Sequence, residues 1–180
     1  DGEGNVNDNK KNDNNINNEN INKDKENKDE TGNNSTTQSK EDDYSITEII
    51  GDSDFDVQYT GYKLVDTYPE DETNQVFSVD PRMGYRLLVL NFSVENITDK
   101  DKTIDLVSDD IKLILNINNN EMLYPQLTLL ENNLQFIKMD IKANEKITAV
   151  VIFEVPEDME LTDMSLTVSK DSMTKEKVVK

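Results

Sequence analysis

The sequence predicts an all-β protein: an antiparallel β-sandwich with at most one short helix, preceded by a disordered Asn-rich tail. Two observations predict this fold. Apolar and polar residues alternate along several stretches after residue 44, which is typical of strands with one buried face. Turn residues separate these stretches, and repeated short strands with turns between them favour sheets packed face to face.

Residues 1–43 differ from the rest of the chain. They contain only three apolar side chains (Val6, Ile16 and Ile21), whereas 13 of them are Asn and their charges are 12 acidic and 6 basic. Such a segment cannot bury enough apolar surface to offset the ordering of its backbone, about 1 to 2 kcal/mol per residue. We therefore expect residues 1–43 to be a disordered Asn/Asp/Lys-rich tether.

Residues 44–170 are expected to form the folded domain. Its clearest strand covers residues 86–95, which we expect to bury one face. That face carries four apolar side chains: Leu88, Leu90, Phe92 and Val94. Polar side chains lie opposite: Asn91, Ser93 and Glu95. The same alternation predicts strands near residues 57–65, 111–117, 147–155 and 164–168.

The connections carry their own signals. Residues 118–120 are all Asn, which tolerates the left-handed conformation of tight turns, so they predict a hairpin between 111–117 and a short run at 122–124. Leucines and isoleucine at 127, 130, 134 and 137 follow helical spacing, so we expect at most a short helix near 127–134 crossing one end of the sandwich. Residues 171–180 are polar, and we expect a frayed tail unless Val178 and Val179 extend an edge strand.

Composition excludes several classes of function. The chain has no Cys, His or Trp, and its 38 acidic and 19 basic residues give a formal charge of -19. Without Cys and His it cannot build a thiolate nucleophile, a Ser-His-Asp triad or a zinc site of the usual N/S type. The negative charge disfavours nucleic acid and anionic membrane surfaces as partners. No apolar run reaches the roughly 18 residues that span a bilayer.

Asp52, Asp54 and Asp56 are the candidate metal ligands, with Ca²⁺ as the candidate ion. Their spacing matches the start of a Ca²⁺ loop, but the EF-hand pattern also needs Gly at its sixth position and Glu at its twelfth, where this chain has Val57 and Lys63. A Ca²⁺ site of another type is one interpretation. A solvated acidic turn is the other, because the whole chain is acidic.

Two further groups have the chemistry of a binding site. The first is an oxygen-rich group that consists of Asn116, Asn118, Asn120 and Glu121. Hairpin geometry already accounts for its asparagines. The second consists of Tyr59, Tyr62, Tyr68 and Tyr124. These tyrosines form an exposed recognition patch in one interpretation, and in the other most of them cover the rim of the sandwich. Paired carboxylates for glycoside hydrolysis are a weaker signal, because close pairs arise by chance in so acidic a chain.

The stretch NFSVENITDKDKTI at 91–104 contains two N-glycosylation sequons, which matter only in a cell that performs this modification. Asn91 lies in the middle of a strand. We expect residues 96–102 to form a charged, exposed connection, after which Ile104 and Leu106 return to the core.

The order of these segments resembles a known family. A hydrophobic strand ends in the turn Val94-Glu95-Asn96, a strand and hairpin follow at 110–125, and a long strand ends in FEVP at 153–156. The chain thus resembles small immunoglobulin-like lipoproteins of Gram-positive bacteria, catalogued as a domain of unknown function, and the related fold of a secreted mycobacterial immunoprotective antigen. The match spans about residues 55–170. Ala143-Asn144 stands where such proteins often have Pro-Gly.

The resemblance implies an immunoglobulin-like Greek-key sandwich displayed outside the cell, anchored through a lipidated Cys upstream of residue 1. We therefore expect a non-enzymatic cell-surface or secreted binding domain, without cofactor. Its expected partner is an envelope or extracellular protein, or a second copy of the chain. The alternatives are a Ca²⁺-responsive or carbohydrate-recognising module of the same fold, and a small hydrolase that uses only carboxylates.

Overall fold

The computed structural model of the chain describes residues 44–71, 77–119 and 121–180. The tether predicted for residues 1–43 lies outside these residues. The described part contains ten strands, and every pairing between named strands is antiparallel. The predicted antiparallel, all-β fold is therefore confirmed.

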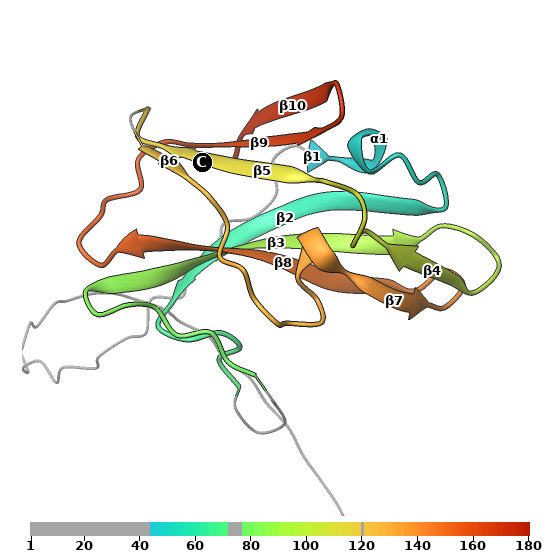
Figure 1. Ribbon diagram of the computed structural model, residues 1–180, viewed down its shortest axis with the longest axis horizontal. Helices are drawn as coiled ribbons and strands as arrows, with labels where there is room; N and C mark the ends of the chain where they lie inside the picture. Colours follow the sequence, from blue (N-terminus) through green and yellow to red (C-terminus); the bar gives the residue numbers. More distant parts are fainter. Residues whose placement is uncertain (1–43, 72–76, 120) are drawn as a thin grey trace, which may run out of the picture. The chain divides into compact units, whose positions relative to one another are not determined.

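The first sheet has the strand order β1-β2-β3-β8 (Figure 1). Its strands are β1 Tyr44–Ser45, β2 Phe55–Val65, β3 Tyr85–Asn96 and β8 Lys146–Pro156. β2 pairs with β3 across a bulge between Tyr59 and Gly61, and β8 pairs with the other side of β3. The strand expected at 86–95 is thus the centre of this sheet.

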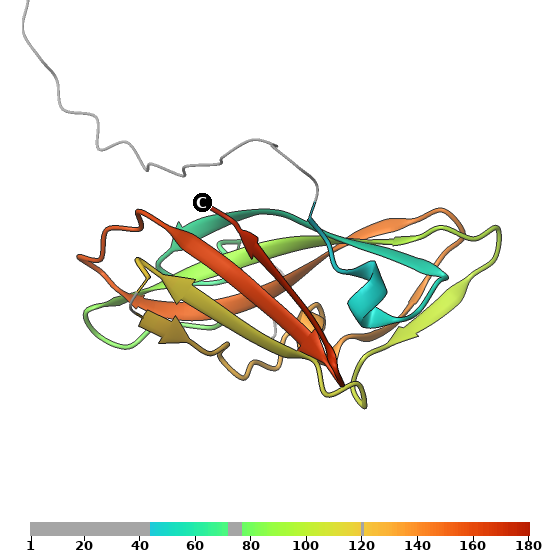
Figure 2. The ribbon, with the colours of Figure 1, turned by 90° about the horizontal axis from the view of Figure 1, so that it is seen from above.

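The second sheet has the order β10-β9-β5-β6. Its strands are β5 Lys112–Ile117, β6 Glu121–Leu123, β9 Met164–Lys170 and β10 Met173–Val178. This sheet lies over the first when the domain is seen from above (Figure 2). The hairpin predicted between β5 and β6 is present, and Asn118 and Asn119 adopt left-handed φ angles of 51° and 58°. Asn120 lies outside the described residues.

Short elements close the ends of the sandwich. β4 Lys102–Asp105 pairs with β7 Lys138–Ile141 in a separate two-stranded sheet. The one-turn helix α1 Thr47–Ile50 buries Ile49 and Ile50 and ends at Gly51, whose φ of 76° is a left-handed conformation that glycine adopts without strain. A 3₁₀ helix covers Leu134–Phe136.

The main core lies between the two large sheets. The apolar face predicted for the central strand is part of it, since Leu88, Leu90, Phe92 and Val94 are fully buried. Side chains of β8 complete this side, and β5 and β9 supply the other, with Leu113, Leu115, Leu166 and Val168 among them. Ile104 and Leu106 return to this core as expected.

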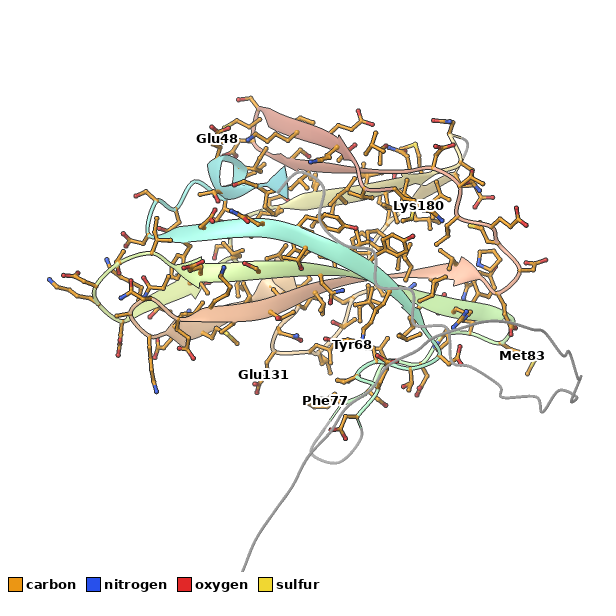
Figure 3. The ribbon with its side chains drawn as sticks, turned by 180° about the vertical axis from the view of Figure 1, so that it is seen from behind. Glu48, Tyr68, Phe77, Met83, Glu131 and Lys180 are labelled. Carbon is orange, nitrogen blue, oxygen red and sulfur yellow. The ribbon has the colours of Figure 1, made fainter. Side chains whose placement is uncertain are left out.

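A second, smaller core covers the outer side of the first sheet. It consists of Val65, Leu87, Val89, Val150 and Ile152, and Tyr68, Val79 and Leu130 pack against it. Figure 3 shows Tyr68 and Glu131 on this outer side, away from β5 and β9. The expectation that the strand at 86–95 buries only one face is therefore wrong for its first half, where four consecutive residues, 87–90, are fully buried.

Residues 124–133, here called the crossing segment, run along the free edge of β8. Gln126 N donates to Ile152 O at 2.7 Å, and Val150 N donates to Asn132 O at 2.8 Å. The helix expected near 127–134 is not formed, because these backbone groups bond to β8 instead of to one another. Leu127 is 81% exposed rather than on a buried helical face, and the only helical turn here is the 3₁₀ helix at 134–136.

Candidate functional site

A groove of about 630 Å³ lies where β5, the loop at 106–111 and the crossing segment meet. Buried core residues such as Leu106, Ile111 and Leu113 line it together with three exposed apolar side chains. These three are Val107 at 52% exposure, Tyr124 at 65% and Phe136 at 45%. Large apolar side chains are normally withdrawn from water, so this concentration at a concave place marks a candidate binding surface.

The same stretch of chain exposes further apolar side chains. Met122 of β6 is 57% exposed, and Leu127 and Leu129 of the crossing segment are 81% and 74% exposed. Leu130, in contrast, packs on the second core. The crossing segment is thus attached to the first sheet by few side chains and presents others to solvent.

Backbone and charged contacts hold the loop at 106–111 in place. Leu106 N donates to Ile137 O at 2.9 Å, and Asp109 N donates to Leu106 O at 3.1 Å. The Lys170 ammonium bonds both the Asp109 carboxylate, at 2.7 Å, and the carbonyl of Ile50 at the end of α1, at 2.8 Å. One side of the groove is therefore fixed to β9 and α1.

Asp105, just before this loop, is also held. Lys138 lies 2.6 Å from its carboxylate, which links β4 to β7. The hydrogen bond from Lys138, assisted by one from Val107 N, keeps the pKa of Asp105 below its usual value.

The 3₁₀ helix forms the opposite wall of the groove. Asn133 caps it, since its Oδ1 accepts from Gln135 N at 3.1 Å while its Nδ2 donates to Thr128 Oγ1 at 2.9 Å. Gln135 then donates from Nε2 to Ile111 O at 3.4 Å, at the start of β5. Phe136 is thereby positioned over the groove by a buried asparagine.

One edge of β5 is open at the groove. β5 pairs with β9 along residues 112–117, but with β6 only along residues 115–117. Residues 112–114 therefore have a ladder partner on one side only, and all three line the groove.

The groove carries few charges. Asp109 is paired with Lys170, and Asp110 with Lys112 at 3.2 Å in a pair whose side chains are largely exposed. An exposed pair of this kind contributes little to stability.

The three candidate Ca²⁺ ligands have separate partners. Asp52 Oδ1 accepts from Asp54 N, Asp54 Oδ2 accepts from Lys102 Nζ at 2.6 Å, and the Asp56 carboxylate accepts from Thr47 Oγ1 and Gln58 Nε2. The hydrogen bond with Asp54 raises the pKa of Lys102. Within the described residues no group of three acidic side chains is arranged to hold a metal ion. Ca²⁺ binding at these residues stays a prediction.

The asparagines of the β5–β6 hairpin serve the fold. Asn118 Oδ1 accepts from Thr162 Oγ1 and from the N–H groups of Thr162 and Asp163, and its Nδ2 donates to Glu160 O at 2.8 Å. Asn116 Nδ2 contacts Ser165 Oγ at 3.5 Å. The amide of Asn118 is thus used to hold the loop before β9.

The four tyrosines do not gather in one patch. Tyr62 is buried in the main core, and Tyr59 packs edge-on against Phe92 with ring centroids 5.8 Å apart. Tyr68 covers the second core, and only Tyr124 lies at the groove. The interpretation of the four tyrosines as one recognition patch is therefore wrong. Tyr59 and Tyr68 instead cover the cores of the sandwich, as the alternative interpretation had it, and Tyr62 lies within the main core.

Asn96 is the polar residue that sequence reasoning misplaced most clearly. It was expected at the start of an exposed connection, yet it is fully buried. Its Nδ2 donates to the carbonyls of Lys100, Ile141 and Lys142 at 2.8, 2.9 and 3.1 Å. Its Oδ1 accepts from Thr98 N and Thr98 Oγ1 at 3.0 and 2.8 Å. The Asn-x-Thr spacing was the signal of this turn.

Sequence reasoning also missed Val107 and Phe136 as groove residues. The alternation of Leu127, Thr128 and Leu129 after Pro125 was a signal that the chain is extended here, because apolar and polar residues alternate with period two in an extended segment.

None of the helices in the described part of the chain has the length and hydropathy to cross a membrane.

Fold and groove together define a class: a small antiparallel β-sandwich domain with an apolar groove beside an open strand edge. Residues 44–178 match the model of the domain of unknown function DUF4352, and the chain belongs to that family. The expected membership of a family catalogued as a domain of unknown function is thus confirmed, whereas the lipid anchor and the relation to the mycobacterial antigen stay predictions. Comparison with curated proteins gave no significant match.

Several solved structures are similar to this chain. An uncharacterized β-sandwich protein from Clostridium difficile 630 is 11% identical, with a TM-score of 0.49 over 72% of this chain and 87% of that one. A conserved hypothetical protein from Bacillus anthracis is 12% identical, with a TM-score of 0.42 over 77% and 96%. A protein from Staphylococcus aureus provisionally assigned as a lipoprotein is 16% identical, with a TM-score of 0.39 over 80% and 92%.

Proposed function

We propose that this domain is a non-enzymatic protein-binding module and that the groove beside β5 is its binding surface. The observation that carries the proposal is the exposure of Val107, Tyr124 and Phe136 around one concave place. Protein interfaces bury aromatic side chains at their centre, where water is excluded. A partner that covers the groove would withdraw all three side chains from water.

The chemistry of the lining supports binding rather than catalysis. Its two carboxylates belong to Asp109 and Asp110, and each forms an ion pair with a lysine. The rest of the lining is mainly apolar, as in surfaces that recognise side chains.

We further propose that the domain works outside the cytoplasm, anchored to the cell envelope by a lipid upstream of residue 1. The resemblance to immunoglobulin-like lipoproteins supports this location. Growth of the native host with an alkyne-tagged fatty acid tests it. The expected result is a labelled protein in the membrane fraction, and an unlabelled protein in the soluble fraction would contradict the anchor.

Crosslinking on intact cells tests the binding surface. The full-length protein is expected to recover a defined envelope protein, and a double variant with Tyr124→Ser and Phe136→Ser is expected to recover at least about tenfold less, since central aromatic side chains dominate interface energies. Met83→Ser is the matched control, because Met83 is fully exposed and does not line the groove. Equal recovery by the double variant would contradict the proposal.

A further inference from the structure

We propose that the groove recognises an extended segment rich in basic and apolar side chains, which adds as a strand to the open edge of β5 at residues 112–114. This inference rests on the proposed function and specifies its partner. Strand addition of this kind obtains affinity from backbone hydrogen bonds and specificity from pockets for alternate side chains.

The orientation of the β5 backbone supports this mode of binding. Asn118 N donates to Asp163 O on the β9 side, so in a trans peptide the carbonyl of Ile117 points to the β6 side. Because backbone groups alternate along a strand, the N–H and C=O of Leu115 and Leu113 point the same way. Leu115 meets Leu123 of β6 there, whereas Leu113 faces the groove.

The carbonyl of Ile111, two residues before Leu113, already accepts a hydrogen bond. Ile111 O accepts from Gln135 Nε2 at 3.4 Å, which marks the inner end of the open edge. An added strand therefore finds one donor and one acceptor at Leu113, between β6 on one side and Gln135 on the other. Val107, Tyr124 and Phe136 line the same groove and can contact the side chains of the added strand.

Two of the other sheet edges in the described part of the chain are protected. β10 carries Lys175, Glu176 and Lys177 in the middle of its edge, and such charges oppose strand addition. The free edge of β8 is covered by the crossing segment through Gln126 and Asn132. The β5 edge, in contrast, has the sequence Lys112, Leu113 and Ile114, and the exposed side chains of Tyr124 and Phe136 line the same groove.

Charge decides the chemistry of the occupant. The chain carries a formal charge of -19, although Asp109 and Asp110 at the groove are each paired with a lysine. A basic segment is attracted by this potential, whereas a second copy of the chain brings the same negative charge and is repelled. The occupant is therefore a segment of another protein that alternates basic and apolar residues.

Fluorescence anisotropy with the full-length protein and a labelled octapeptide of alternating Lys and Val tests the inference. Two further peptides carry N-methyl groups, one on every Val and the other on every Lys. In antiparallel addition the residue hydrogen-bonded to Leu113 points its side chain inward, so the Val N–H groups face β5. Methylation of the valines is expected to weaken binding at least about tenfold, and methylation of the lysines by no more than about twofold.

The remaining measurements distinguish this inference from the proposed function. An alternating Glu/Val octapeptide is expected to bind at least about tenfold more weakly, because its charge is repelled. If both methylated peptides bind as tightly as the parent, or if the parent does not bind, strand addition is wrong. Groove-dependent crosslinking on cells would still support the proposed function in either case. A dimer of the free protein that Tyr124→Ser dissociates would show that the occupant is a second copy and overturn the inference.

Discussion

A single buried side chain, Asn96, holds two connections of the sandwich together. Its amide uses both hydrogens and its oxygen within the protein, joining the turn after β3 to residues 141 and 142 at the end of β7. Buried polar groups stabilise a fold only when they are satisfied in this way, and an unsatisfied group costs about 1 to 3 kcal/mol.

Asn96→Asp is therefore expected to lower the free energy of unfolding by at least about 3 kcal/mol, since a carboxylate would face three carbonyl oxygens with no hydrogen to donate. Chemical denaturation measures the loss. Asn119→Asp adds the same charge at an exposed turn residue and is the control, with an expected change within about 0.5 kcal/mol. Equal stabilities of the two variants would contradict the role assigned to Asn96.

Tyr59 presents the opposite case, a buried polar atom without a partner. Its hydroxyl oxygen is shielded from solvent and has no hydrogen-bond partner among the described residues. Burial, and to a lesser extent the nearby Tyr62, raises the pKa of the Tyr59 hydroxyl above its usual value of 10.0. The native state therefore favours the protonated phenol.

Tyr59→Phe is expected to leave stability unchanged or to raise the free energy of unfolding by up to about 1 to 3 kcal/mol, because an unsatisfied hydroxyl is removed. The pH dependence has a definite sign. The stability linked to the raised pKa is fully present below about pH 10 and is lost as the pH rises further, so only the wild type should lose this component. Thermal unfolding between pH 8 and about 11 measures it, with the exposed Tyr124→Phe as control. A clear loss of stability at neutral pH would mean that the hydroxyl has a partner after all.

At the scale of elements, the crossing segment has two roles, carried by leucines three positions apart. Leu130 packs on the second core, whereas Leu127 points to solvent. Leu130→Ala is expected to lower the free energy of unfolding by about 1 to 3 kcal/mol, because partly buried apolar surface is lost from that core. Leu127→Ala is the matched control and should change stability by no more than about 0.5 kcal/mol. Urea denaturation distinguishes the two, and equal losses would contradict the attachment described above.

The sequence predicted the strands well where one face is polar. Residues 111–117 and 164–168 alternate cleanly and lie in β5 and β9. It also predicted the strands that contain 87–90 and 149–153, but it assigned them only one buried face. Their continuous apolar runs are typical of a strand buried on both faces. The segments that cover the outer face of this sheet come from distant parts of the chain. The alternation of apolar and polar residues within one strand therefore does not predict them.

The site was harder to predict than the fold. Tyr124 was singled out, but it was grouped with three tyrosines that the fold places elsewhere. The groove depends on β6 ending at Leu123, three residues short of covering the β5 edge. That length is set by where the chain turns toward β8 at Gln126, a tertiary contact with no local signal.

At the scale of the whole molecule, the charge of -19 sets the response to salt. Added NaCl is expected to raise the melting temperature, because screening weakens the repulsion among like charges. Ca²⁺ and Mg²⁺ at equal concentrations should raise it equally if they act only by screening. An additional shift with Ca²⁺ that Asp54→Asn removes would support the predicted site at Asp52, Asp54 and Asp56, since a ligand of the native state stabilises it by mass action. Thermal unfolding of the full-length protein measures each shift.

The buried turn at Asn96 also restricts the hosts in which this protein can be produced. Asn96-Ile97-Thr98 is a glycosylation sequon, and the nitrogen that would carry the sugar is the Nδ2 atom that donates to three carbonyls. A eukaryotic secretory pathway attaches the glycan before the chain has folded, so the sugar would occupy a place that the native state fills with backbone. Material secreted from yeast or mammalian cells should misfold unless Thr98 is changed, whereas bacterial expression avoids the conflict.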